Sequence, residues 1–560
     1  MKILLAGVNC KYVHTNLALR YLKCVTGELC DVVISEFNIN DNVISVERKI
    51  LIQKPEIVAF SCYIWNIDFI LQLCSDLKKA LPNLIIILGG PEVSYDCVQI
   101  MVNNDSIDYI IKGEGEIVFP NLIKSILFHT VLPKSGVVYR ENDNIIETQW
   151  AECPDFSFIP FPYADLTDEF KHKILYYESS RGCPYSCKYC LSGDSSKLRF
   201  KEVNEVCRDL SFFDTQGVEL VKFVDRTFNA DKKRANKIWH HISTLSGNTR
   251  FHMEISGELL DDEAIDVLKT VPSDKLQFEI GVQSTNPHTI DAIARKSNIN
   301  KLFDTITKVL SKTSIHIHLD LIVGLPYEDM SSFKKSFCDV VALRPQVLQI
   351  GFLKVLKGSA MHREAEKYGI IYRDKAPYEI ISNPWLSYDE VLYLKDFEFV
   401  FDKIYNSGSF CKTIDYLFSE YDNPYEVFEK ILLHFQNHNL INASFSKDNL
   451  FSQVYDCFSH LGDKFEVALR YDYIFSLKSS TIPRWSKADP NFRYSEEVYA
   501  FLRNEELKRK IMPKFYDVPA KTAIKQLRFE RIGNKIVVFD LKSSDVYDVT
   551  KYFPKSKKFG

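Results

Sequence analysis

Three cysteines lie close together in the middle of the chain, at Cys183, Cys187 and Cys190. Their C-x3-C-x2-C spacing places three thiols on one short loop, one fewer than a 4Fe-4S cluster normally takes from a protein. A cluster held in this way leaves one iron open to bind a small molecule. Zinc is the alternative, but zinc sites usually combine two ligand pairs, and no second Cys or His pair follows at a short interval. The spacing therefore favours an iron-sulfur cluster with one reactive iron.

The aromatic Tyr189, directly before the last cysteine, completes a pattern that resembles the signature of the radical S-adenosylmethionine (radical SAM) enzymes. The resemblance implies that S-adenosylmethionine (SAM) chelates the open iron. An electron from the reduced cluster would then split SAM into a 5'-deoxyadenosyl radical that abstracts hydrogen. The resemblance also implies a reductant such as flavodoxin or ferredoxin, and it places Tyr189 against the adenine. The three cysteines would be metal ligands and catalytic residues at once.

Polar residues at the ends of predicted strands give a second indication of a cofactor site. Glu254, Gln283 and Asp320 offer acceptors for ribose hydroxyls or an ammonium group, and Arg295 offers a cation for a carboxylate. The segments Gly-Val-Gln-Ser at 281–284 and Asp-Leu-Ile-Val-Gly-Leu-Pro at 320–326 are similar to those of the oxygen-independent coproporphyrinogen oxidases, which are radical SAM enzymes. By that resemblance the four residues and Ser284 would contact SAM.

Strand-like and helix-like stretches alternate from Lys173 to about Arg363, which predicts a partial (β/α)6 barrel of TIM-like kind with its ligands at the carboxyl ends of the strands. The cysteine loop follows the first of these strands. Asp225 ends the second strand, and two interpretations stay open for it: contact with substrate or cofactor, or a structural role in the turn. The predicted strands are 174–178, 220–225, 251–256, 276–282, 315–322 and 347–353.

The first 135 residues show the same alternation with five short apolar strands, which predicts a doubly wound, flavodoxin-like parallel sheet. Ligands of such sheets lie across the carboxyl ends of the strands. Two of the loops there are rich in glycine, Gly-Gly-Pro-Glu at 89–92 and Gly-Glu-Gly-Glu at 113–116. Glycine lets a large flat ligand approach the backbone, although it also serves ordinary strand-to-helix turns. The predicted strands are 3–8, 31–37, 57–61, 84–88 and 108–111.

A sheet of this kind ahead of a radical SAM core looks like the cobalamin-binding domain of cobalamin-dependent radical SAM enzymes. The resemblance implies a cobalamin cofactor, with Gly89, Gly90, Gly113 and Glu114 as candidate contacts. The chain has no Asp-x-His-x-x-Gly string, whose histidine ligates cobalt from below in classical cobalamin proteins. His14 lies in a different context and is interpreted as a polar surface or turn residue, so no cobalt ligand is assigned.

The domain organisation follows from these patterns. Residues 1–135 form the cobalamin-binding-like domain, 136–172 a linker interrupted by Pro154, Pro160 and Pro162, and 173–365 the radical SAM core. Residues 370–560 are expected to form a mainly helical region with a strand-turn-strand around Gly533 and a small basic module at the end. Residues 508–560 carry 14 Lys or Arg against 5 Asp or Glu, which allows contact with a nucleic acid but is more typical of a solvated face.

The composition is that of a globular protein, with 46% apolar and 26% charged residues and a net charge of −4. No run approaches 18 apolar residues, so no membrane span is expected. Fourteen cysteines would suggest disulfides in a secreted protein, but the N-terminus enters a strand-like run too short for a signal peptide, which indicates a reducing compartment. We therefore expect a cytoplasmic protein. The six cysteines of the N-terminal domain are widely spaced and are interpreted as core residues rather than as ligands of a second cluster.

The sequence supports one leading function and leaves others open. A cobalamin-dependent radical SAM enzyme, most simply a methyltransferase acting on an unactivated carbon, accounts for the order of the modules. Radical oxidative cyclisation or rearrangement, and RNA modification by methylthiolation, keep the same core. A non-catalytic iron-sulfur or cobalamin carrier is the alternative from another class, although a carrier would not need the polar residues that fit SAM.

Overall fold

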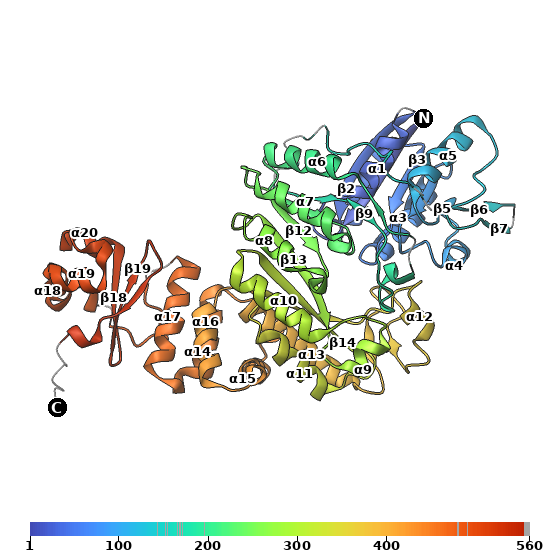
Figure 1. The fold of residues 1–560 in the computed structure, drawn as a ribbon. Helices are drawn as coiled ribbons and strands as arrows, with labels where there is room; N and C mark the ends of the chain where they lie inside the picture. The colour runs from blue at the N-terminus through green and yellow to red at the C-terminus, as the bar shows by residue number, and fades with distance from the viewer. Residues whose placement is uncertain are drawn as a thin grey trace. The chain divides into compact units, whose positions relative to one another are not determined.

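The structure is a computed structural model that describes residues 1–27, 29–142, 144–151, 153, 155–164, 166, 170, 172–194, 197–478, 481–489 and 491–553. Pro154, one of the three prolines behind the predicted linker, lies outside these residues. The chain forms two compact units, Met1–Val391 and Leu392–Gly560 (Figure 1). No helix of the described residues combines the length and the apolar character that a membrane crossing needs.

The N-terminal domain is a parallel sheet in the order β2-β1-β3-β4-β5, which confirms the predicted doubly wound fold. Helices α1 and α5 pack on one face through residues such as Leu19 and Phe119, and α2, α3 and α4 pack on the other face. The strands are β1 Lys2–Asn9, β2 Asp31–Asn38, β3 Ile57–Ser61, β4 Ile85–Gly89 and β5 Tyr109–Ile111. The helices are α1 Leu17–Thr26, α2 Val43–Ile52, α3 Ile67–Ala80, α4 Cys97–Asn103 and α5 Gly115–Phe128.

An antiparallel hairpin, β6 Val137–Glu141 and β7 Asn144–Glu147, extends this sheet beyond β5. The sequence prediction assigned these residues to the linker and missed the hairpin. The hairpin is short, and only Val137 and Val138 are fully buried in it, so its strands lack the apolar runs by which the other strands were found.

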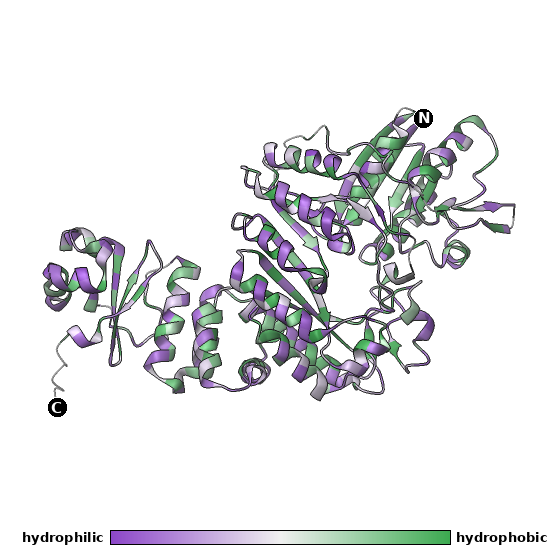
Figure 2. Ribbon diagram, in the orientation of Figure 1, coloured by the Kyte–Doolittle hydropathy of each residue, from purple (hydrophilic) through white to green (hydrophobic). Residues whose placement is uncertain are grey.

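The second sheet has six parallel strands in the order β15-β14-β13-β12-β11-β8, which confirms the predicted partial barrel. Its strands carry both green and purple in Figure 2, because buried apolar residues alternate with half-buried polar ones along strands such as β13 and β14. The strands are β8 Ile174–Tyr177, β11 Leu220–Phe223, β12 Arg250–Glu254, β13 Leu276–Gln283, β14 His316–Val323 and β15 Val347–Phe352. The helices are α6 Val203–Thr215, α7 Lys232–Ser243, α8 Asp262–Leu268, α9 Pro287–Ala292, α10 Ile299–Lys312 and α11 Met330–Val341.

Residues 354–391, here called the strap, return from the last barrel strand and stay with the first unit. The strap contains α12 Ala360–Glu364, β16 Ile371–Tyr372 and β17 Ile380–Ser382. Ile380 N donates to Leu353 O at 2.9 Å. The strap also contacts the N-terminal domain, because the Tyr378 hydroxyl donates to Glu92 and Lys357 lies 3.1 Å from Asp96. The predicted start of the C-terminal region near residue 370 therefore falls inside the first unit.

The second unit is helical with a three-stranded antiparallel sheet at its end. The predicted strand-turn-strand is β18 Leu527–Ile532 and β19 Lys535–Asp540, joined by Gly533 at a φ of 54°, and β20 Val546–Asp548 adds a third strand. Its helices, with α13 Tyr388–Phe401 leading into them, are α14 Cys411–Glu420, α15 Pro424–Asn437, α16 Lys447–Phe458, α17 Asp463–Leu477, α18 Glu496–Arg503, α19 Glu505–Ile511 and α20 Ala520–Gln526.

Several basic residues of the C-terminal module pair with acids of the same unit. Lys514 lies 2.8 Å from Asp545, and Lys535 lies 2.8 Å from Asp548. Arg528 donates to Glu530 at 3.0 Å. Part of the positive charge counted in the sequence is thus neutralised within the fold.

Candidate functional site

The cysteine loop begins where β8 ends and is held by backbone hydrogen bonds. A short strand, β9 Ser180–Arg181, pairs with β10 Arg199–Phe200, and Gly182 then turns the chain with a φ of 90°. Cys190 N donates to Cys187 O at 3.1 Å, and Lys188 N donates to Ile293 O at 3.0 Å. The loop is therefore anchored to the residues that follow α9.

A cavity of about 260 Å³ lies beside this loop and contains most of the predicted SAM contacts. All three cysteines of the motif line it, together with Tyr189. Four polar residues from three different strands and the turn after α9 line it as well: Glu254, Gln283, Arg295 and Asp320. Residues that are up to 137 positions apart in the sequence thus meet in one place, as the parallel strand order requires.

Several polar atoms in this cavity are buried and have no hydrogen-bond partner within the described chain. They are Gln283 Oε1, Asp320 Oδ1 and Arg295 Nε. Buried polar atoms are normally satisfied, so these atoms indicate a bound polar molecule. Arg295 Nη1 donates to the Tyr189 hydroxyl at 3.2 Å, and Gln283 is held at a φ of 72° in an irregular part of β13.

Burial disfavours the charged forms of two carboxyl groups in this cavity, Glu254 and Asp320. Burial raises the pKa of Glu254 to about 7, and the nearby charge of Arg226 opposes that rise. Burial, together with Glu279 and Glu254, raises the pKa of Asp320 well above its usual range. A cation placed between these groups would favour their ionised forms.

Ser284, the other predicted SAM contact, does not line this cavity. Its side chain is fully buried, and its hydroxyl donates to Glu328 Oε1 at 2.6 Å. Ser336 donates to the same oxygen at 2.9 Å. Ser284 follows the bulge at Gln283, so its side chain points into the packing between β13 and α11 rather than into the cavity.

Asp225 has a structural role. Its side chain is fully buried, and it accepts hydrogen bonds from Ser179 N at 2.8 Å and from the Ser179 and Ser180 hydroxyls at 2.6 Å each. The carboxylate thereby ties the end of β11 to the start of the cysteine loop. Of the two interpretations, the geometry favours the structural one.

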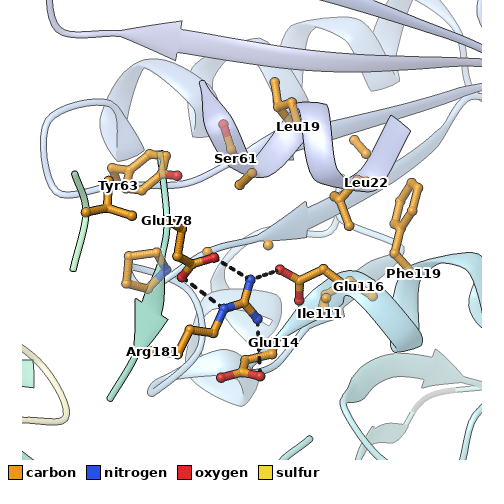
Figure 3. A pocket seen from close by; sticks show the side chains of 18 of the residues that line it. Leu19, Leu22, Ser61, Tyr63, Ile111, Glu114, Glu116, Phe119, Glu178 and Arg181 are labelled. Carbon is orange, nitrogen blue, oxygen red and sulfur yellow. Dashed lines mark hydrogen bonds and ion pairs between the residues drawn. The ribbon is translucent and has the colours of Figure 1, made fainter. Parts of the chain in front are cut away.

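A second cavity, of about 450 Å³, lies between the N-terminal sheet and the barrel. Its lining includes the four glycine-loop residues singled out from the sequence: Gly89, Gly90, Gly113 and Glu114. Figure 3 shows its apolar side, where Leu19, Leu22, Ile111 and Phe119 lie around the hollow, and its polar side around Arg181. His14 does not line this cavity. The His14 Nδ1 atom lies 2.6 Å from the Tyr176 hydroxyl instead.

Gly90 gives this cavity its close backbone approach. Its φ of +109° suits glycine, and a Cβ there would lie 2.5 Å from Cys62 O. We predict that Gly90→Ala weakens ligand binding in this cavity by roughly tenfold or more, because a strained backbone of this kind costs about 1–3 kcal/mol and the loop would shift. Equilibrium dialysis with cobalamin measures it. Gly217→Ala is the matched control, since Gly217 has a φ of +70° but open space around its Cβ position. Equal affinity in wild type and Gly90→Ala would refute the prediction.

The polar side of the second cavity is a buried ion cluster centred on Arg181 (Figure 3). Arg181 donates to Glu178 at 2.9 Å and to Glu116 at 2.5 Å, and it lies 3.3 Å from Glu114. Arg199 also pairs with Glu114 at 2.6 Å. Burial alone would raise the pKa of Glu114, but hydrogen bonding to Arg199 and the charge of Arg181 lower it. The sequence analysis missed Arg181, although its position two residues before Cys183 was a usable signal.

A third cavity, of about 420 Å³, lies inside the barrel under the loops of the N-terminal domain. Aromatic residues Tyr63 and Trp65 form part of its wall, and Lys222 and His252 form another part. Arg226 lines this cavity and both of the others. The three spaces therefore adjoin at one side chain, which follows β11.

Family models match three successive parts of the chain. The B12 binding domain matches residues 3–123, and the radical SAM superfamily matches residues 177–337. The chain belongs to the cobalamin-dependent radical SAM family. Residues 366–551 match a third model, described as a protein of unknown function (DUF4080).

Relatives of this radical SAM protein are distant. The cobalamin-dependent radical SAM methyltransferase TokK of Streptomyces tokunonensis is 25% identical over 57% of this chain and 50% of its own length. An anaerobic magnesium-protoporphyrin IX monomethyl ester cyclase of Synechocystis sp. is 27% identical over 40% of this chain and 46% of its own. The chain spans about half the length of these curated relatives. Most of its curated relatives are named as methyltransferases or methylases.

The fold also has a solved counterpart. The cobalamin-dependent SAM radical enzyme OxsB, with aqua-cobalamin and SAM bound, superposes with a TM-score of 0.63 at 14% identity, over 86% of this chain and 82% of OxsB. At this identity the likeness concerns the fold alone. The superposition covers the N-terminal domain and the barrel together, and not just one of them.

Family membership implies a 4Fe-4S cluster and SAM for the barrel and cobalamin for the N-terminal domain. The 260 Å³ cavity fits SAM, because it joins three thiols, an arginine for the carboxylate and unpartnered acceptors for hydroxyls or ammonium. The 450 Å³ cavity fits part of a large flat cofactor, because an apolar hollow adjoins glycine loops that allow close backbone approach.

Binding of SAM should depend on pH through Glu254. Its pKa of about 7 is expected to fall when the SAM ammonium lies nearby, so affinity is full above about pH 7 and declines below it. We predict that the dissociation constant rises by up to about tenfold per pH unit below that point, as measured by anaerobic titration from pH 6 to 8. The Glu254→Gln variant should bind SAM more weakly, and its dissociation constant should no longer change with pH in this range, because the titrating carboxyl group is gone. A flat wild-type profile would contradict the assignment.

Proposed function

We propose that the protein transfers a methyl group to an unactivated carbon of a small substrate. The observation that carries the proposal is the meeting of three cavities at Arg226, because a substrate in the barrel cavity would adjoin both cofactor cavities. The methyltransferase names of most curated relatives support the same reaction.

The chain's own residues have separable tasks in this proposal. When bound, cobalamin supplies the methyl group, and the reduced cluster with SAM supplies the hydrogen-abstracting radical. Cys183, Cys187 and Cys190 hold the cluster, and Arg295 holds the SAM carboxylate. Glu254, Gln283 and Asp320 hold the ammonium and ribose. The backbone at Gly90 and Gly113 receives cobalamin.

The protein also encloses the space in which the substrate would bind. The barrel cavity is bounded by strands on one side and by Tyr63, Trp65 and Pro91 of the N-terminal domain on the other. A radical formed next to it would meet substrate before water, since closing a site around reactive species limits side reactions. The substrate itself is not identified by these features.

Anaerobic reconstitution with iron, sulfide and cobalamin tests the proposal. Under a chemical reductant, the loaded protein should form 5'-deoxyadenosine from SAM, and S-adenosylhomocysteine should form only when cobalamin is present. Deoxyadenosine without S-adenosylhomocysteine would instead favour an oxidative cyclisation or rearrangement. Failure to bind cobalamin, or no deoxyadenosine at all, would refute the proposal.

A further inference from the structure

The barrel cavity is distinct from the two cofactor cavities and carries its own set of charged groups. Four strands supply Tyr176, Lys222, His252, Glu254 and Glu279, and the N-terminal domain covers them. The residues that fit SAM line the neighbouring cavity, and of these only Glu254 also lines the barrel cavity. The glycine loops line the second cavity. The barrel cavity is therefore available to a third molecule.

Most of its carboxylates already have partners. Glu279 Oε2 lies 3.0 Å from His252 Nε2. Glu92 accepts a hydrogen bond from the Tyr378 hydroxyl. Glu254 also faces the SAM cavity, where its carboxylate is expected to be used. None of these acids neutralises the remaining cations by direct contact.

Two cations of the cavity have no ion-pair or hydrogen-bond partner among the residues that the structure describes: Lys222 and Arg226. Lys222 is half-buried on β11, where its neighbours in register are Tyr176 and His252. By contrast Lys357, a third cation of this cavity, pairs with Asp96 at 3.1 Å. Arg226 is exposed at the cavity wall, and Glu254 acts on both cations only at a distance. Both side chains can therefore donate charge-assisted hydrogen bonds to an anion in the cavity.

The opposite wall is aromatic. The rings of Tyr63 and Trp65 stack with centroids 4.4 Å apart and an angle of 4° between their planes. Trp65 is 44% exposed, although its Nε1 atom is fixed by donating to Val8 O at 3.2 Å. Flat aromatic surfaces of this kind bind planar or apolar groups.

We propose that the substrate of this site is a small organic anion. Its carboxylate or phosphate binds between Lys222 and Arg226, and its planar or apolar part lies against Tyr63 and Trp65. This inference rests on the proposed function, since it names the substrate class for the same reaction. Arg226 faces both cofactor cavities, so an anion held there keeps the attached carbon near them.

Binding of simple probes to the reconstituted protein tests the inference. The protein carries its cluster, cobalamin and SAM, so that the cofactor cavities are filled. Benzoate, phenyl phosphate and neutral benzamide are titrated by anaerobic calorimetry. We expect at least one anion to bind tenfold or more tightly than benzamide, and the stronger of the two anions tells carboxylate from phosphate.

Variants assign the effect to the two cations. Lys222→Met and Arg226→Gln should each weaken binding of the preferred anion by about tenfold or more, and Lys222→Arg should keep most of it. Lys237→Met, on the outer side of α7, is the control and should bind like wild type. Cluster and cobalamin absorbance of each variant show whether its cofactors are intact.

Three results would overturn the inference. They are equal binding of anions and benzamide, wild-type affinity in Lys222→Met, and anion binding that occurs only when cobalamin is left out. The last would mean that an anionic group of the cofactor occupies the cations. Binding is measured without turnover, so the protein can bind the anion as expected even if it transfers no methyl group. Equally, methyl transfer can be detected even if the anions do not bind.

Discussion

Replacing Cys187 by Ala is expected to abolish both cluster assembly and formation of 5'-deoxyadenosine. Cys187 is one of three thiols on the loop, and two ligands are too few to hold a 4Fe-4S cluster firmly. Its side chain is buried beside Arg295, whose Nη1 atom lies 4.0 Å from the sulfur. Absorbance near 400 nm, iron content and deoxyadenosine yield after reduction measure the effect, and we expect at least about a hundredfold loss of product.

Cys207→Ala is the matched control, because Cys207 is half-buried on α6 and lines none of the three cavities. It should assemble the cluster like wild type. If Cys187→Ala retained a full iron complement and normal deoxyadenosine yield, the cluster would have to be held by other residues.

Replacing Arg181 by Met is expected to have the largest effect on stability. The change leaves Glu116 and Glu178 buried without the cation that pairs with both, and breaking a buried pair in this way costs about 3–5 kcal/mol. Burial already raises the pKa of Glu178 against the opposing charge of Arg181, so without the arginine the pKa of Glu178 should rise further. The deficit should therefore shrink as pH falls from about 7.5 to 5.5, because protonation removes the unpaired charge.

Urea unfolding of the first unit, followed by tryptophan fluorescence at several pH values, measures this effect. Arg48→Met, an exposed arginine on α2, is the control and should change stability by no more than about 0.5 kcal/mol. Adding Glu178→Gln to Arg181→Met should recover part of the loss at neutral pH. A deficit that stays constant with pH would mean that the loss comes from packing rather than from charge.

Sequence patterns sufficed for the two sheets and for most of the SAM cavity. Fully buried parallel strands such as β3 read as continuous apolar runs, and the βα alternation orders their carboxyl ends on one side. Glu254, Gln283 and Asp320 could be placed together because each ends or nearly ends such a strand. The cysteine spacing predicted the cluster loop, which forms the remaining side of the SAM cavity.

Residues whose roles depend on tertiary partners could not be predicted in this way. Ser284 follows Gln283 directly, yet one position further along β13 its hydroxyl meets Glu328 instead of the cavity. For Asp225 the sequence left a site role and a structural role open, and its hydrogen bonds with Ser179 and Ser180 favour the structural one. Arg226 carries no motif, and its place between three cavities follows only from the docking of the two domains.

Besides the ion cluster around Arg181, two further junctions of unequal strength join the two cofactor domains. On one side the backbone of the first loop is continuous with the barrel, since Ile174 N donates to Val13 O at 2.7 Å and Thr15 donates to Ile174 O at 2.8 Å. On the other side the strap holds the N-terminal domain by the side-chain contacts Tyr378–Glu92 and Lys357–Asp96. Such side-chain contacts are each worth only about 1 kcal/mol net. The strap is thus the weaker of these two junctions, and local opening there is expected to cost less free energy than separation at the first loop.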